Sequence, residues 1–575
     1  MTLEQRQALT AVARGDAAAD LVIRNATVCN VYSGELWPVH VAVAGDRVAY
    51  VGKQPPPARE EWDAAGRYLA PGFVEPHAHP QVVYNPASLL EGVLPRGTTT
   101  LFCDDRAFVE CLPDADAALA GLPGSIRWLA SCFPATAVAE PHTGPFAPEA
   151  VRRRLDHPHV AATMEMGRWA LLYRGEPAYL ETHRLALARH RRIEGHFSGA
   201  SAQRLSALAA AGVTSDHEAI TAEEVVERLR MGFWVMLRHS SLRRDLPGLL
   251  AVITDSAVDT SRLMFTTDGS APAFIAAHGF QDQMLRIAVK AGIGPVRALQ
   301  MVTLNPAVYY GVEADVGGIA PGRRADLVVL GDLTGFEPER VMAGGRWVVE
   351  GGRLAVPWPK VDWAAAMPPA AWADPARFDD PMLYPATHSS GEPFPVIELV
   401  NAVITRRRDV PLPAREGRVT LEADQDLIHL AMADRLGRWI TRGVAKGLAP
   451  GVAGFAISLN VAGQLLVFGR DPAAMALAAR RVAELRGGMV LAEGGQLLWE
   501  FPLPLGGLMS DRPFAEVVKC EQELTRLLQR RGYPHHDPLY TLMFLPVDGL
   551  PRLRLAPLGL YDIQAELVVR GVDPL

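Results

Sequence analysis

The chain has 575 residues, of which 49% are hydrophobic and 21% charged, and its formal net charge is −7 at pH 7. This length exceeds what one hydrophobic core supports and predicts several domains. The acidic balance argues against nucleic acid or an anionic membrane surface as the main partner. No CxxC pair occurs, so reduced thiols are expected at the five cysteines, Cys29, Cys103, Cys111, Cys132 and Cys520.

The amino-terminal segment, residues 1–69, begins with a polar stretch of helical character and continues as short strands with tight turns. It lacks the apolar centre of a secretory signal, and no run reaches the roughly 18 apolar residues of a spanning helix. We therefore expect a cytoplasmic protein. A matching strand pattern returns at residues 316–356. The two segments are most simply explained as halves of one small β-sandwich that closes around the chain between them.

The middle segment, residues 70–315, alternates short apolar strands with amphipathic helices, which is typical of βα units and a parallel sheet. Helices fit at residues 201–212 and 221–232, the second with Thr221 as its N-cap and Glu224 three positions later. The pattern predicts a (β/α)8 barrel of the TIM type. The expected strands are residues 73–79, 98–105, 126–132, 160–166, 191–197, 213–218, 233–239 and 262–268.

The remainder of the chain divides at a change of composition. Residues 357–395 are rich in proline, alanine and tryptophan and predict an extended linker. Residues 396–575 contain the strands and helices of a separate C-terminal α/β domain. The fold class is therefore α/β, with a catalytic barrel, a flanking β-sandwich and this additional domain.

The first barrel strand ends in His77-Ala78-His79. Because residues i and i+2 of a strand project to the same face, both imidazoles can point at one metal ion. Catalytic groups of a TIM barrel come from the carboxyl ends of its strands. Reading those ends yields six ligand-type side chains that converge on one mouth: His77, His79, Glu165, His196, His217 and Asp268.

This set can hold two divalent ions bridged by a carboxylate. Imidazole and carboxylate ligands suit manganese, iron or zinc, and the lack of thiolates argues against a structural zinc site. Two such ions lower the pKa of a shared water and polarise the bond under attack. Asp268 is the expected general base and acid, Glu218 is the candidate for a second proton, and Arg238 and His239 are candidate substrate contacts.

Each of these residues also has an ordinary structural interpretation. A histidine can be a core residue or cap a helix, and Asp268 can open a turn. Glu165 is harder to explain this way, because a buried carboxylate without a partner is costly. The coincidence of these side chains at five of the eight expected strand ends favours the metal site.

Several longer motifs point to one family. They are PGFVEPHAH (71–79), VLPRGTTT (93–100), SCFPAT (131–136), EGHFSG (194–199), residues 210–238, TLNPA (303–307), GGIAPGRRADLVVL (317–330), PLPLGGLMSD (502–511) and DPLYTLMFLPV (537–547). With these motifs the chain resembles the adenine deaminase family of the amidohydrolase superfamily, as a divergent member. The last two motifs are similar to that family's own C-terminal domain.

The resemblance implies hydrolysis of adenine, or a related 6-aminopurine, to hypoxanthine and ammonia at a binuclear manganese or iron centre, with zinc as a further option. By motif match it implies the same six ligands. It also suggests a homo-oligomer that acts on a small-molecule purine base.

The chain departs from the family's pattern around the ligands. Pro80-Gln81-Val82-Val83 stands where the family usually has an Ile-Glu-Ser-Ser type stretch, and Asp104-Asp105-Arg106-Ala107 replaces an Asp-Pro-His-Glu motif. Gly269 follows Asp268 in place of a second aspartate, and Asn460-Val461-Ala462-Gly463 replaces a His-Asp-Ser-His segment. Two alternatives therefore stay open. One is an amidohydrolase for an N-substituted adenine or a cyclic amide, and the other is a catalytically weak metal-binding homologue.

Overall fold

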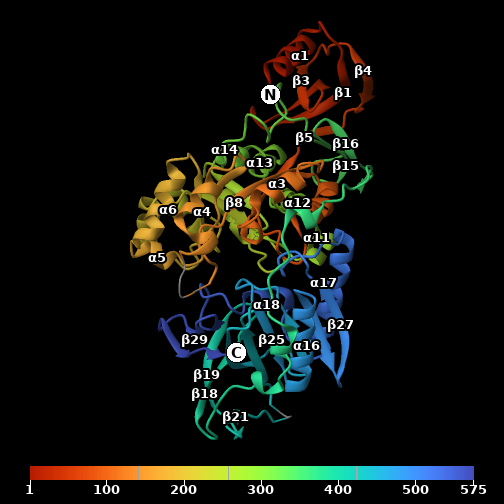
Figure 1. The fold of residues 1–575 in the computed structure, drawn as a ribbon. Coiled ribbons are helices and arrows are strands. Elements are labelled where there is room, and N and C mark those ends of the chain that lie inside the picture. The colour runs from red at the N-terminus through yellow and green to blue at the C-terminus, as the bar shows by residue number, and fades with distance from the viewer. Residues whose placement is uncertain (137, 139–141, 257, 423–424) are drawn as a thin grey trace.

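The protein is described here from a computed structural model, which covers residues 1–136, 138, 142–256, 258–422 and 425–575. Three parts follow one another along the molecule (Figure 1). A small β unit lies at one end, the barrel lies in the middle, and the C-terminal domain lies at the other end. In the described part of the chain, no helix has both the length and the apolar character needed to cross a membrane.

The β unit is built from the two segments that flank the barrel. After helix α1 (Leu3–Arg14), strands of both segments join one sheet in the order β17-β16-β15-β14-β5-β1-β2-β3, with β4 paired to β1. The antiparallel pair β5–β14 connects the segments, with Leu69 opposite Val329. The strands are β1 (Ala19–Asn30), β2 (Glu35–Ala44), β3 (Arg47–Gly52), β4 (Ala58–Asp63), β5 (Tyr68–Pro71), β14 (Leu327–Leu330), β15 (Pro338–Ala343), β16 (Arg346–Glu350) and β17 (Arg353–Leu354).

The barrel confirms the predicted fold class. Within the described residues, eight strands run parallel in chain order from β6 to β13. The two end strands meet where the Thr266 hydroxyl donates to the backbone oxygen of His77 at 3.2 Å, so the barrel is nearly closed. The strands are β6 (Phe73–Ala78), β7 (Thr98–Asp104), β8 (Ser125–Ala130), β9 (Val160–Thr163), β10 (Arg192–Gly195), β11 (Ser215–Asp216), β12 (Trp234–Arg238) and β13 (Leu263–Thr266).

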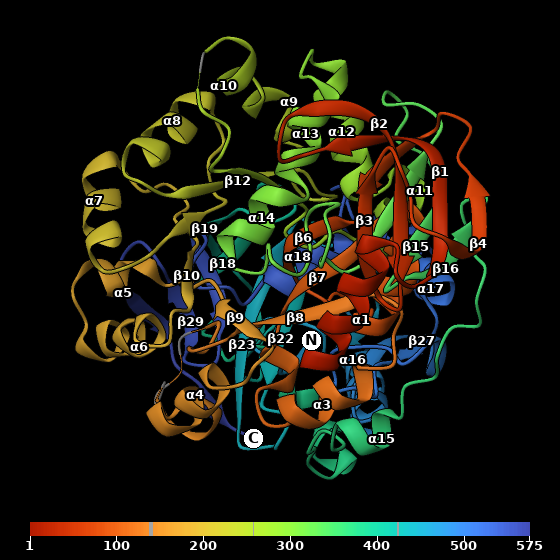
Figure 2. The same cartoon turned by 90° about the horizontal axis from the view of Figure 1, so that it is seen from above.

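Helices cover the outside of these strands, and Figure 2 shows α4 to α8 along one side. They are α2 (Pro86–Val93), α3 (Leu112–Leu119), α4 (Pro148–Leu155), α5 (Trp169–Tyr173), α6 (Pro177–Leu187), α7 (Ala202–Ala210), α8 (Ala222–Arg230), α9 (Leu246–Leu249), α10 (Ala251–Thr254), α11 (Pro272–His278), α12 (Gln281–Lys290), α13 (Pro295–Met301) and α14 (Leu304–Tyr309). Thr221 caps α8 by accepting from the Glu224 backbone. The Glu224 carboxylate accepts from Ile220 rather than Thr221, so the capping box is only half formed.

The segment between the β unit and the last domain is mostly irregular, with the short α-helix α15 (Trp363–Ala366) and two 3-10 helices, Pro375–Phe378 and Pro381–Leu383. The C-terminal domain has a sheet in the order β19-β18-β23-β22-β25-β24-β26-β27, with β31 paired to β23. Its helices are α16 (Pro472–Glu484), α17 (Phe514–Gln529) and α18 (Pro538–Phe544). The sheet strands are β18 (Pro393–Leu399), β19 (Thr405–Pro411), β22 (Ile428–Ala433), β23 (Trp439–Lys446), β24 (Gly454–Ile457), β25 (Leu465–Gly469), β26 (Gly488–Glu493), β27 (Gln496–Pro502) and β31 (Asp573–Pro574).

Small sheets complete this domain, with β20 (Ala414–Arg415) and β21 (Arg418–Val419) in one and β28 (Leu553–Ala556), β29 (Gly559–Asp562) and β30 (Leu567–Arg570) in the other. The domain docks on the barrel through backbone and side-chain hydrogen bonds. The Ser510 backbone donates to the Val83 oxygen at 2.7 Å, and the Asn85 amide donates to the Ser510 oxygen at 2.7 Å. In Figure 1, α17 lies beside α11 of the barrel.

Candidate metal centre

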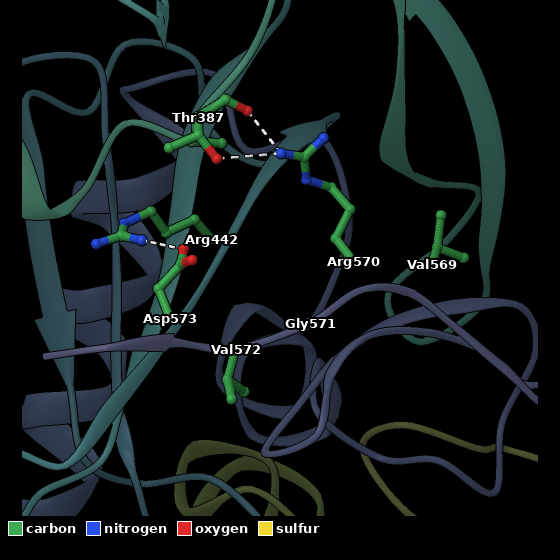
Figure 3. A pocket seen from close by; sticks show the side chains of 8 residues that line it. Thr387, Arg442, Val569, Arg570, Gly571, Val572 and Asp573 are labelled. Carbon is green, nitrogen blue, oxygen red and sulfur yellow. Dashed lines mark hydrogen bonds and ion pairs between the residues drawn. The ribbon is translucent and has the colours of Figure 1, made fainter.

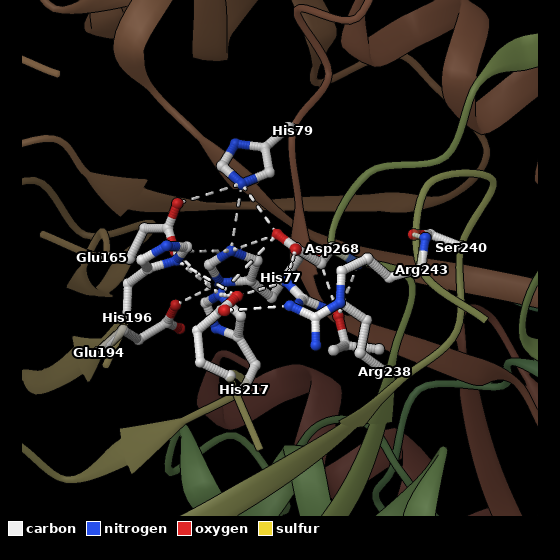
Figure 4. A network of polar contacts seen from close by, with 12 residues as sticks. His77, His79, Glu165, Glu194, His196, His217, Arg238, Ser240, Arg243 and Asp268 are labelled. Atoms are coloured by element: carbon white, nitrogen blue, oxygen red, sulfur yellow. Dashed lines mark hydrogen bonds and ion pairs between the residues drawn. The ribbon is translucent and has the colours of Figure 1, made fainter. Parts of the chain in front are cut away.

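The first ligand group is carried by strand β6 and the residue just beyond it. His77 and His79 project to the same side, and their Nε2 atoms lie 3.2 Å apart. The Oδ1 atom of Asp268, two residues past β13, lies 3.4 Å from His77 Nε2 and 3.3 Å from His79 Nε2. Glu165, two residues past β9, completes the group, with Oε1 at 3.6 Å from His79 Nε2. Figure 4 shows these side chains pointing toward one another.

The second ligand group shares Glu165 with the first. Its Oε2 atom lies 2.7 Å from His196 Nδ1 and 2.9 Å from His217 Nε2. These two histidines directly follow β10 and β11, and their facing nitrogens are 3.2 Å apart. The ligand atoms of His77, His79, Glu165 and Asp268 lie within 4.8 Å of one another, as do those of Glu165, His196 and His217. The structure therefore brings together all six ligand-type residues expected from the strand ends.

Two buried carboxylates contact the imidazoles of the first group at Nδ1, the ring nitrogen that does not face the ligand group. Glu194 Oε2 lies 2.5 Å from His77 Nδ1, and Asp104 Oδ2 lies 3.1 Å from His79 Nδ1. Asp104 also accepts from Gln81 at 2.7 Å. A carboxylate on one ring nitrogen fixes the tautomer and leaves the other nitrogen free to bind a metal. The Nε2 atoms of both histidines consequently face the ligand group.

These two carboxylates were missing from the residues chosen by sequence. Glu194 precedes His196 by two positions on β10, so strand alternation places both on the same face. It is also a buried carboxylate, and an unpartnered buried carboxylate is costly, as for Glu165. Asp104 is the last residue of β7, at one of the strand ends that face the barrel mouth. Both signals were present in the sequence.

Arg238 connects the candidate ligand Asp268 to a neighbouring carboxylate. It is the last residue of β12, it is buried, and it forms ion pairs with Asp268 and, at 2.5 Å, with Glu218. Glu218 is also paired with Arg243 at 3.1 Å, and its Oε1 lies 3.6 Å from His196 Nδ1. Glu218 Oε1 also lies 3.7 Å from His217 Nε2, and the potential ligand atoms of His217, Glu218 and Asp268 lie within 4.8 Å of one another, so Glu218 adjoins the ligand groups directly.

The surrounding carboxylates give the cluster a negative potential. Burial by itself would lower the pKa of His79 and His196, yet the carboxylates outweigh it. Asp104 and Asp268 raise the pKa of His79 to about 9, and Glu165 and Glu218 raise that of His196 to about 10. A potential that attracts protons to imidazoles also attracts metal cations, which bind the same nitrogens.

The donor set fits divalent cations on chemical grounds. It consists of imidazole nitrogens and carboxylate oxygens, the ligands preferred by manganese, iron and zinc in catalytic sites. The 3.2 Å separation between paired imidazole nitrogens is close to that of two ligands bound about 2.1 Å from one ion. Glu165 belongs to both groups, with Oε1 facing His79 and Oε2 facing His196, so it could contribute to both sites.

His239 lies apart from the cluster. Its ring packs near Phe274, with ring centres 6.2 Å apart, and its Nε2 lies 3.4 Å from the amide nitrogen of Gln283. These neighbours belong to α11 and α12. The assignment of His239 as a substrate contact stays a prediction, whereas Arg238 does reach the cluster.

A cavity of about 330 Å³ lies in the C-terminal domain, away from these residues (Figure 3). Arg442 and Arg570 line it, but both have protein partners. Arg442 is paired with Asp573, and Arg570 donates to the backbone oxygen of Thr387 at 2.6 Å. The residues that line this cavity include none of the predicted site residues.

Comparison with known proteins agrees with this architecture. The family model for the "Adenine deaminase C-terminal domain" matches residues 402–566, and that for the "Amidohydrolase family" matches residues 172–348. The adenine deaminase of Moorella thermoacetica is 34% identical over 97% of this chain and 96% of its own length. That of Nitratidesulfovibrio vulgaris is also 34% identical, over 97% of both chains.

The chain belongs to the adenine deaminase family. Membership extends over nearly the full length, so the C-terminal domain is part of the family's architecture. Among solved structures, the β-aspartyl dipeptidase of Fervidobacterium islandicum AW-1 covers 59% of this chain and 98% of its own, at 16% identity and a TM-score of 0.46.

Proposed function

We propose that this member of the adenine deaminase family hydrolyses adenine, or a closely related 6-aminopurine, to hypoxanthine and ammonia. The observation that carries the proposal is the pair of ligand groups that share Glu165, in a chain 34% identical over 97% of its length to an adenine deaminase. The reaction forms a bond from a water oxygen to C6 of the purine and breaks the bond from C6 to the exocyclic nitrogen.

The cofactor we propose is a pair of divalent ions, manganese or iron, with zinc as a further option. His77, His79, Glu165 and Asp268 would hold one ion, and Glu165, His196 and His217 would hold the other. When bound, such ions lower the pKa of a water molecule and polarise the purine for attack.

Carboxylates of the protein transfer the protons of this reaction. Arg238 holds the pKa of the Asp268 carboxyl well below its usual range despite burial, so this carboxylate is ionised at neutral pH. Asp268 accepts the proton of the attacking water and returns it to the departing amine. Glu218, held by Arg238 and Arg243, is placed to carry the second water proton from the new C6 oxygen to a ring nitrogen of the product. Glu194 and Asp104 orient the imidazoles throughout.

The direct test is ammonia release from a purine panel by metal-loaded protein, with ring opening of cyclic amides measured in parallel. We expect turnover of adenine, and a loss of more than about a hundredfold in Asp268→Asn, because a general base contributes at least that much. Near-wild-type rates in Asp268→Asn would remove this residue from the mechanism. Turnover of cyclic amides alone would reassign the substrate.

A second candidate is an N-substituted adenine. Gln81, which donates to Asp104 beside His79, stands where the family's usual motif carries a glutamate, so the polar surroundings of the site are altered. Turnover of N-substituted adenines in preference to adenine would favour it. A protein that binds two metal ions and turns over neither panel would be the weak homologue described above.

We also propose how the remaining features serve this activity. Residues 70–315 would be the catalytic domain, residues 1–69 and 316–356 its supporting β unit, residues 357–395 a linker, and residues 396–575 the C-terminal domain. We propose a cytoplasmic enzyme that acts on small molecules rather than nucleic acid or membranes, and a homo-oligomer. The net charge of −7 supports the exclusion of polyanionic partners.

A further inference from the structure

We propose that the C-terminal domain completes the substrate site, with the Tyr540 hydroxyl donating a hydrogen bond to a ring nitrogen of the bound purine. This inference rests on the proposed function and extends it to a residue far outside the barrel. Tyr540 lies on α18, which Figure 1 places between the barrel and the C-terminal sheet.

The Tyr540 hydroxyl adjoins the ligand cluster. Its oxygen lies 2.7 Å from the point that a Cβ atom on Gly269 would occupy, and that point is 3.3 Å from the Cβ atom of His79. Gly269 directly follows Asp268 and has a φ of +72°. The hydroxyl therefore packs against the turn that carries one metal ligand and lies beside another. A side chain at position 269 would collide with it.

The hydroxyl is buried without a partner. Tyr540 is 2% exposed, and among the described residues no hydrogen-bond partner reaches its oxygen. Buried hydroxyls are nearly always hydrogen-bonded, because leaving one unpaired costs free energy. Tyr533 in the same domain shows the usual arrangement, since its buried hydroxyl lies 2.5 Å from the Thr541 hydroxyl. A ligand with an acceptor atom would satisfy Tyr540 in the same way.

The surroundings hold this hydroxyl in place. Asp537 accepts from the Tyr540 backbone at 3.1 Å and so caps α18, and its carboxylate also bonds to Ser241. Ser241 in turn accepts from the Ala271 backbone at 3.1 Å, and Tyr84 donates to the Ser270 oxygen at 2.8 Å. The helix and the turn after Asp268 are thereby tied together. Ring nitrogens of a purine are acceptors, and a preorganised donor is suited to select for them.

The test compares Tyr540→Phe with Tyr533→Phe as the matched control. Metal-loaded proteins are assayed for turnover of adenine, for binding of hypoxanthine by calorimetry, and for melting temperature. In Tyr540→Phe we expect about a tenfold loss of affinity and of kcat/KM, the usual effect of one neutral hydrogen bond, with no fall in melting temperature. In Tyr533→Phe we expect unchanged affinity and a lower melting temperature, because that bond lies within the protein.

The nitrogen concerned is identified with 1-deaza-, 3-deaza- and 7-deazaadenine as competing ligands. The analogue that lacks the nitrogen bonded by Tyr540 should bind the wild type about tenfold more weakly than the other two. In Tyr540→Phe all three analogues should bind with similar affinity. If the wild type turns over adenine and Tyr540→Phe has the same kcat/KM and affinity, this inference is overturned and the proposed function stands. A wild type that neither binds nor deaminates purines would overturn the proposed function together with it.

Discussion

Glu194 and Asp104 are the residues that decide which nitrogen of each first-strand imidazole faces the ligand group. Both carboxylate oxygens of Glu194 have a partner, since Oε1 accepts from the Tyr310 hydroxyl and Oε2 lies 2.5 Å from His77 Nδ1. Asp104 accepts from Ser131 at 2.6 Å and from Gln81 at 2.7 Å. Because each carboxylate is itself held, the imidazoles have little freedom to turn. Preorganisation of this kind governs metal affinity.

Glu194→Gln should lower the affinity for manganese by about 10- to 100-fold, the usual effect of removing such a partner. The amide is a weaker acceptor and can present its NH2 group to His77. Competition with a chelator measures the effect. Glu181→Gln is the control, because Glu181 is exposed and paired only with Arg184 on the protein surface. Unchanged metal affinity in Glu194→Gln would show that His77 is oriented by other contacts.

At the scale of elements, α17 and α11 form one of the contacts between the C-terminal domain and the barrel. Glu521 of α17 is buried, and its Oε2 accepts from the backbone of Ala273 in the first turn of α11 at 2.5 Å. Burial raises the pKa of the Glu521 carboxyl to about 8. The unfolded chain releases this proton near the ordinary pKa of 4.5.

The sign of the pH effect follows from that difference. Between pH 4.5 and about 8 the folded protein binds more protons at Glu521 than the unfolded chain, so stability falls as pH rises through this window. Glu521→Gln keeps an acceptor without the charge. Its melting temperature should match the wild type near pH 4.5 and exceed it increasingly up to pH 8.5.

Calorimetric scans across this pH range check the prediction. Glu523→Gln is the matched control on the same helix, because Glu523 is exposed and its carboxylate accepts from the Trp499 indole within the C-terminal domain. A constant difference between Glu521→Gln and the wild type at every pH would contradict the buried-carboxyl explanation. The result would also report on domain docking, because the bond to Ala273 crosses the interface.

At the scale of the whole molecule, the barrel gathers the candidate ligands from residue 77 to residue 268, so the proposed metal binding requires the folded barrel. A ligand that binds only the folded state stabilises it by mass action. Saturating manganese, at a hundred times its Kd, should stabilise the barrel by about 2.7 kcal/mol per site. A chelator should reverse the effect, and His217→Ala should reduce it.

Thermal scans and elemental analysis test this together. We expect close to two metal ions per chain after growth with manganese, since the six ligands divide into two groups. A persistent single equivalent would point to a mononuclear centre. If neither manganese nor the chelator changes the melting temperature, the site is not coupled to folding of the barrel.

Much of the barrel and of the ligand cluster could be derived from local patterns. Each predicted strand is present, although several end two or three residues early, as β9 does at Thr163. Glu165 therefore sits in a loop rather than on the strand, yet it still reaches the mouth. Apolar runs and the two-residue alternation of strands are local properties, and the family motifs located the ligands independently. The role of His239 stays a prediction, and its contacts with α11 and α12 could not be read from local patterns.

The sequence of residues 70–315 alone was sufficient to predict the barrel strands and their order. It also identified the six ligand-type side chains, because alternate residues of a strand face the same side. The residues that orient those ligands could be predicted from the sequence only in part, and Glu194 is one that could. The approach of Tyr540 to Gly269, and the burial of Glu521 against Ala273, depended on how the C-terminal domain packs on the barrel. Such contacts join residues more than 240 positions apart, and only the packing of complete domains brings them together.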